Sequence, residues 1–139
     1  MDLLSFFRGR RSAREQAELE AAVAAVDREL AANLELTTMF DQTRQAFVLE
    51  NGHFAIFAET LQRLVPETHA EAAGLYARIV DAEGAMERRG PANSITEADR
   101  AIVETWEGDA RHVQRRLRAA AATPPPSGWQ RLRARLRVR

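Results

Sequence analysis

Hydrophobic residues recur along most of this chain at intervals of three and four, which is the spacing of one face of an α-helix. The first such run follows Ser12-Ala13-Arg14-Glu15, a capping box in which serine and glutamate side chains satisfy free N–H groups at a helix start. Because Asn51-Gly52 is the next stop signal, the pattern predicts a first helix over residues 12–49. Its inward positions form two stripes that face different neighbours, namely Leu19, Val23, Val26, Leu30 and Leu34, then Leu36, Phe40, Thr43 and Phe47.

Two further helices are predicted to run back along the first. One covers residues 53–64 and ends at Val65, because a residue followed by proline avoids the helical backbone conformation. The next covers residues 67–89 and ends before a Gly-Pro pair. Together they are about as long as the first helix, so we expect a long antiparallel hairpin whose return leg is kinked at Pro66.

A second capping box, Ser94-Ile95-Thr96-Glu97, opens a fourth predicted helix over residues 95–121. The chain shows no alternating pattern of the kind that β-strands require. The sequence therefore predicts an all-α fold, an antiparallel bundle of three or four helices over residues 12–122. Asn33 interrupts the first apolar stripe, and an asparagine in such a seam more often fixes the register of helices than performs chemistry.

Both ends of the chain differ from the predicted bundle. Residues 1–11 form a basic and apolar N-terminal segment, and residues 123–128 form a proline-rich linker that cannot continue a helix. Residues 129–139 form a flexible arginine-rich tail. If the tail is helical, Trp129, Leu132 and Leu136 share one side and arginines occupy much of the rest.

A formal net charge of zero conceals a strong segregation of charge. Residues 1–14 carry +3, residues 15–110 carry −12 from 19 acids and seven arginines, and residues 111–139 carry +9 with no acid. An acidic body with basic ends indicates an anionic partner, or tails that neutralise the body itself.

The composition excludes several chemistries. The chain has no cysteine and no lysine, which removes disulfides, thiol nucleophiles, cysteine zinc sites, Schiff bases and the P-loop lysine. Two carboxylate and histidine pairs have the spacing of bundle metal sites, Glu50 with His53 and Asp109 with His112. The first pair straddles a helix stop, and His112 lies off the apolar face of its helix. We therefore expect no catalytic residue, no metal and no cofactor, and a protein that is not an enzyme.

Four short stretches resemble a loose group of uncharacterised bacterial all-helical proteins, some of them membrane-anchored. The resemblance covers about residues 29–80, through Glu29–Leu36, Phe57–Leu61, Leu64–Glu67 and Leu75–Ile79. It implies no activity and no functional residues, and it favours a location beside a membrane. This chain shows no spanning segment of about 20 apolar residues and no signal peptide, so we expect a cytoplasmic protein, at the inner membrane face where it binds lipid.

These features favour a non-enzymatic interaction module whose basic amphipathic ends contact an anionic membrane surface or an acidic protein partner. The alternative is an oligomeric helical scaffold, a homo-oligomer whose tails cover its own acidic faces. Nucleic acid fits less well because the acidic body repels it, and a metal-binding bundle also fits less well. The candidate contact residues are Phe6, Phe7, Arg10, Arg11, Trp129, Arg131, Leu132, Arg133, Arg135, Leu136 and Arg137.

Overall fold

Ser12 starts the first helix in the computed structural model, which describes residues 11–122. The Ser12 hydroxyl accepts the Glu15 N–H at 3.0 Å, and the Glu15 carboxylate accepts the Ser12 N–H at 3.2 Å. The predicted capping box is thus confirmed, and helix α2 (Ala13–Thr43) follows it. This helix ends at Thr43 and not at residue 49, because Arg44 turns into the left-handed region with a φ of 59°.

The residues after α2 leave the helical path because side chains of other elements bind their backbone. Fully buried Asn33 donates to the Glu50 carbonyl at 2.8 Å and accepts the Glu50 N–H at 2.7 Å. The Glu83 carboxylate accepts the Leu49 N–H at 2.8 Å, and Leu49 itself is buried. Asn33 therefore fixes the position of a non-helical segment, residues 44–51, where the sequence predicted continued helix.

The chain reverses direction at Val65, between helix α3 (Gly52–Leu64) and helix α4 (Pro66–Ala77). Phe54, near the start of α3, stacks on Tyr76, near the end of α4, with 4.4 Å between ring centroids. Such a contact requires the two helices to lie side by side and antiparallel. The expectation of one return leg over residues 53–89 is corrected accordingly: the break before Pro66 is present, but the chain turns back there.

The remaining helices complete the bundle. Helix α5 (Ile79–Glu87) follows α4 after a break at Arg78, so the predicted helix over residues 67–89 is divided in two. A short 3₁₀ turn, η1 (Pro91–Asn93), leads to helix α6 (Glu97–Ala121). Thr96, and not Ser94, caps α6, since its hydroxyl accepts the Asp99 N–H at 3.1 Å.

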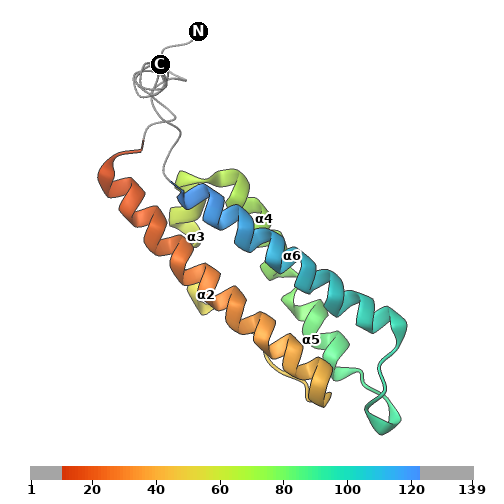
Figure 1. Ribbon diagram of the computed structural model, residues 1–139. Coiled ribbons are helices and arrows are strands. Elements are labelled where there is room, and N and C mark those ends of the chain that lie inside the picture. Colours follow the sequence, from red (N-terminus) through yellow and green to blue (C-terminus); the bar gives the residue numbers. More distant parts are fainter. Residues whose placement is uncertain (1–10, 123–139) are drawn as a thin grey trace, which may run out of the picture.

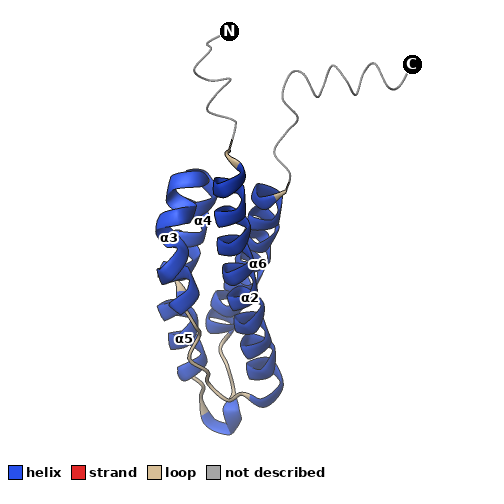
Figure 2. Cartoon of the chain, turned by 90° about the vertical axis from the view of Figure 1, so that its left-hand side faces the viewer, coloured by secondary structure: helices blue, strands red, loops and turns tan. Residues whose placement is uncertain are grey.

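Four legs pack alternately up and down (Figure 1). The first is α2, the second is residues 44–51 with α3, the third is α4 with α5, and the fourth is α6. The described residues are helical with loops and contain no strand, so the predicted all-α bundle is confirmed (Figure 2). The core between the legs includes Leu19, Val26, Leu30, Phe40, Leu61, Leu75, Met86, Val103, Trp106 and Leu117.

Candidate interaction surface at one end of the bundle

The two ends of the described chain lie together. Gln16, in the first turn of α2, donates to the carbonyl of Ala121, the last residue of α6, at 3.0 Å. Gln16 also accepts a hydrogen bond from the Arg11 guanidinium at 3.3 Å. Both chain ends therefore leave from one end of the bundle, which Figures 1 and 2 show from two sides. We call the end that holds Gln16 and Ala121 the terminal end. The opposite end, where α2 ends at Thr43 and the loop of residues 88–96 leads into α6, is the distal end.

Most of the predicted contact residues lie outside the described part of the chain. Phe6, Phe7 and Arg10 precede it, and Trp129, Arg131, Leu132, Arg133, Arg135, Leu136 and Arg137 follow it. Arg11 is the exception, and it lies half-buried at the terminal end. The proline-rich linker and the tail also fall outside the described residues. The structure accordingly shows where these segments join the bundle.

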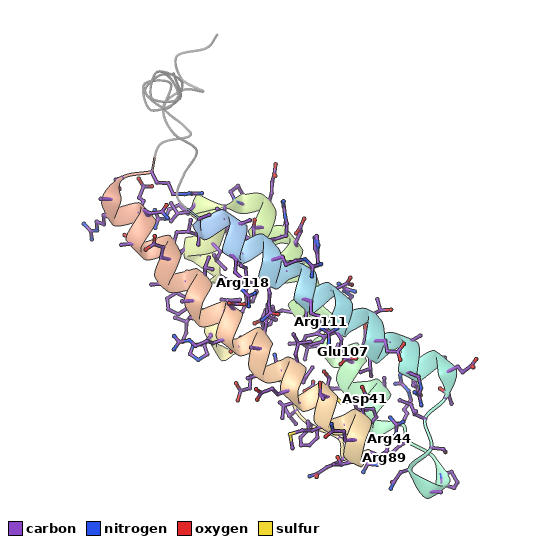
Figure 3. The ribbon with its side chains drawn as sticks, in the orientation of Figure 1. Asp41, Arg44, Arg89, Glu107, Arg111 and Arg118 are labelled. Atoms are coloured by element: carbon purple, nitrogen blue, oxygen red, sulfur yellow. The ribbon has the colours of Figure 1, made fainter. Side chains whose placement is uncertain are left out.

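Acidic residues lie in the first half of helix α6 and most of its arginines in the second half. Between Glu97 and Asp109 it carries five acids and one arginine, whereas residues 111–121 carry four arginines and no acid. The basic half is the half that reaches the terminal end. Figure 3 shows this order, with Arg118 nearest that end, then Arg111, Glu107 and finally Asp41 on α2.

Two acids near the terminal end, Glu15 and Glu18, lie beside an arginine of another helix. Arg63 of α3 binds the Glu18 carboxylate at 2.6 Å and lies 3.9 Å from that of Glu15. The hydrogen bonds from Ser12, together with Arg63 and Arg11, hold the pKa of the Glu15 carboxyl below its usual range. Further from this end, Arg118 reaches the carboxylate of Asp27, at mid-length of α2, with two nitrogens at 3.0 and 3.2 Å. Local ion pairs therefore offset part of the negative charge at this end, where Glu20 and Glu67 have no ion pair among the described residues.

Two arginines of the basic half have no ion pair within the described residues. Arg111 and Arg115 are both exposed, and no carboxylate there lies within salt-bridge distance of either. Arg116, by contrast, lies 3.3 Å from Glu71, which also faces His112 at 3.5 Å. The exposed face of α6 thus offers positive charge that continues toward the chain end.

His53 and His112, the histidines of the two candidate metal pairs, each lie beside a carboxylate of another helix. The His53 N–H donates to the buried Glu29 carboxylate at 2.7 Å, and His112 faces Glu71. Between residues 11 and 122, no three carboxylate or imidazole groups gather in a way that would hold a metal ion. Surface grooves of the described residues include one of about 470 Å³ between α2 and α6 beside Leu34 and Met39, one of about 450 Å³ beside Leu49 and Ile56, and one of about 410 Å³ between α5 and α6 beside Val80.

Comparison of the chain with protein-family models, with curated proteins and with solved structures gave no match. The resemblance over residues 29–80 therefore stays an expectation. None of the helices described between residues 11 and 122 is both long enough and apolar enough to cross a membrane.

Sequence reasoning missed Gln16, the residue that joins the two ends. A glutamine in the first turn of a helix carries no local signal, because its role depends on a partner carbonyl 105 positions away. It also missed Thr37 and Glu107, which meet in the α2–α6 interface with 2.9 Å between their side-chain oxygens. Glu107 is the one charged residue on the buried face of α6 between Val103 and Leu117, and that departure is the signal that could have pointed to it.

Proposed function

We propose that this chain is a non-enzymatic helical interaction module that binds an anionic membrane surface through its two basic ends, at the cytoplasmic face. The observation that carries the proposal is the arrangement of the chain ends, which Gln16 holds together at the terminal end. Two weak anchors act together only when both can reach the same surface. A single short amphipathic or lipid anchor binds marginally, and stable attachment takes two such signals.

The distribution of charge also favours binding with the terminal end toward the membrane. The basic half of α6 lies at the terminal end, where Arg63 pairs with Glu18, and Arg118 pairs with Asp27 further along α2. Each arginine near an anionic leaflet contributes about 1 kcal/mol, so the five arginines of the tail supply several kcal/mol together. The acid-rich half of α6, Glu97–Asp109, lies toward the distal end and faces away from a surface bound in this way.

The linker provides the reach that such binding needs. Residues 123–128 span at most about 20 Å when extended, at roughly 3.3 Å for each residue. Trp129, Leu132 and Leu136 would then enter the headgroup region while the arginines bind lipid phosphates. Phe6 and Phe7 would form the second contact from the neighbouring chain end.

The first test is co-sedimentation with anionic and neutral phospholipid vesicles. We expect the full chain to pellet with anionic vesicles only, and a chain that ends at Thr123 to bind at least about 100-fold more weakly. Raised salt weakens the binding further, because it screens exposed charges. Replacing Arg131, Arg133, Arg135 and Arg137 with glutamine has the same effect as the truncation.

A matched control removes charge from the distal end. Arg89 lies there, as Figure 3 shows, and Arg100 lies in the first turn of α6. Neither has an ion pair among the described residues, so Arg89→Gln with Arg100→Gln changes the net charge by two without touching the terminal end. This variant pellets like the full chain. Equal losses for this variant and for Arg131→Gln with Arg133→Gln, which removes the same charge from the tail, would show a net-charge effect and contradict the proposal.

Two other outcomes would also overturn it. If no chain pellets under any condition and light scattering shows a dimer or larger species, the oligomeric scaffold is the better account. If nothing pellets and the protein is a monomer, the arginines serve its own acidic body or an acidic protein partner.

A further inference from the structure

The interface between α2 and α6 contains a buried carboxyl group without a cation. Glu107 is 7% exposed, and no arginine or histidine nitrogen among residues 11–122 lies within salt-bridge distance of it. Its one hydrogen-bond partner there is the hydroxyl of fully buried Thr37. An ionised carboxylate in such surroundings is costly, and burial normally leads such a group to take up a proton.

The geometry around Thr37 fits a protonated Glu107. The Thr37 hydroxyl oxygen lies 2.9 Å from Glu107 Oε2 and 3.0 Å from the Leu34 carbonyl oxygen. A hydroxyl has one hydrogen and cannot donate to both oxygens fully. If Glu107 carries a proton, it donates to Thr37, Thr37 donates to Leu34, and both contacts are hydrogen bonds.

The charged groups around Glu107 come from both helices. Asp41 of α2 and Glu104 of α6 add to its negative surroundings, and Arg111 of α6 opposes them. Burial raises the pKa of the Glu107 carboxyl above its usual range, and the two acids act in the same direction. The hydrogen bond from Thr37 and the charge of Arg111 lower the pKa in part.

We propose that the α2–α6 interface is a proton-linked switch, which is closed when Glu107 is protonated and loosened when Glu107 loses its proton. Deprotonation weakens the packing of α2 against α6 around Thr37, in the half of the bundle toward the distal end. The inference does not depend on membrane binding, and its test uses no vesicles. Failure of one proposal leaves the other intact.

The direction of the pH dependence follows from linkage. A carboxyl group whose pKa is raised by folding stabilises the folded state below its unfolded pKa, about 4.5, and this stabilisation is lost as the pH rises through the folded value. Other carboxyl groups, such as that of Asp99, have a lowered pKa and act in the opposite direction. The contribution of Glu107 must therefore be measured as a difference between variants.

The experiment compares urea unfolding of the full chain with that of Glu107→Gln, whose amide mimics a protonated carboxyl at every pH. As the pH rises from about 4 to about 8, the unfolding constant of the wild type relative to the variant should grow, by up to tenfold for each pH unit, and then level off. Glu59→Gln is the matched control, because Glu59 is exposed on α3 and has no ion pair within the described bundle. The ratio of the unfolding constants of the wild type and Glu59→Gln should not change with pH.

A second measurement observes the proton directly. The infrared spectrum of the wild type minus that of Glu107→Gln should show the carbonyl band of a protonated carboxyl, and this band should persist to a higher pH than the corresponding band in the wild type minus Glu59→Gln spectrum. A pH-independent ratio in the urea series, or a wild type that gains stability over the variant as the pH rises, would overturn the proposal. An infrared band that disappears at the same pH in both difference spectra would do the same.

Discussion

Replacing Trp106 with alanine will lower the free energy of unfolding by about 3–5 kcal/mol, the usual cost of deleting a large buried aromatic ring. Trp106 is 2% exposed and is the largest of the fully enclosed side chains. Its indole N–H donates to the Leu75 carbonyl at 3.1 Å, and the same carbonyl accepts the Arg78 N–H where α4 gives way to α5. Trp106 thus fills part of the core and also bonds α6 to the third leg, at the point where α4 ends and α5 begins.

Trp106→Phe separates these two roles. Phenylalanine keeps most of the buried ring and removes the N–H donor, while the Leu75 carbonyl retains its bond from Arg78. We expect a loss of about 1 kcal/mol for the missing hydrogen bond, in addition to a small packing loss. Urea denaturation followed by circular dichroism measures both variants. An alanine variant within about 1 kcal/mol of the wild type would show that Trp106 does not occupy the core.

Replacing Glu29 with alanine should cost about 3 kcal/mol, because two backbone N–H groups lose a charged acceptor. Glu29 is 2% exposed, and its two carboxylate oxygens accept the N–H groups of His53 at 2.7 Å and Phe54 at 3.1 Å. It therefore acts as the cap of α3 from a distant helix, where Asn51 makes no side-chain cap bond. Burial and the neighbouring Glu29 carboxylate also raise the pKa of Tyr76.

Two controls define the Glu29 effect. Glu29→Gln retains one carbonyl oxygen and should lose roughly half as much stability. Glu35→Ala lies on the same helix at an exposed position, and it should change the unfolding free energy by less than about 0.5 kcal/mol. Hydrogen exchange should show faster exchange at the start of α3 in Glu29→Ala. Unchanged protection there would contradict the capping role.

The sequence predicted those parts of the fold that depend on neighbouring residues. The heptad-like spacing of apolar residues identified an all-α bundle, the Ser12 capping box marked the start of α2, and Val65-Pro66 marked the end of α3. Each signal acts over a few residues. The choice of Ser94 over Thr96 failed because two hydroxyl residues stood close together, and only the folded loop selects one of them.

Other features depend on contacts between distant residues and could not be predicted in this way. Residues 44–51 have a helical pattern, but Asn33 and Glu83 bind their backbone and hold them out of a helix. A proline signal shows that a helix stops and does not show where the chain goes next, so the reversal before α4 was predicted as a kink. The break at Arg78 has neither glycine nor proline to mark it.

The candidate site shows the same limit. A bundle with an even number of antiparallel legs brings both chain ends to one side, and one with an odd number separates them. The sequence left the choice between three and four helices open, so the relation of the two basic ends could not be derived from it. The segregation of charge singled out the two ends as candidate contact sites. The fourth leg brings the two ends of the described chain together beside Gln16, which contacts Arg11 and Ala121.

The measurement that tests the central claim most directly is the vesicle affinity of four chains: the full chain, one without residues 2–10, one that ends at Thr123, and one with both deletions. If the two ends form one contact, deletion of residues 2–10 weakens partition into anionic vesicles by about tenfold or more, truncation at Thr123 weakens it by about 100-fold or more, and the double deletion abolishes it. Circular dichroism should show that all four chains remain folded, since the deletions leave the described bundle intact. Binding of the doubly deleted chain equal to that of the full chain would contradict the claim.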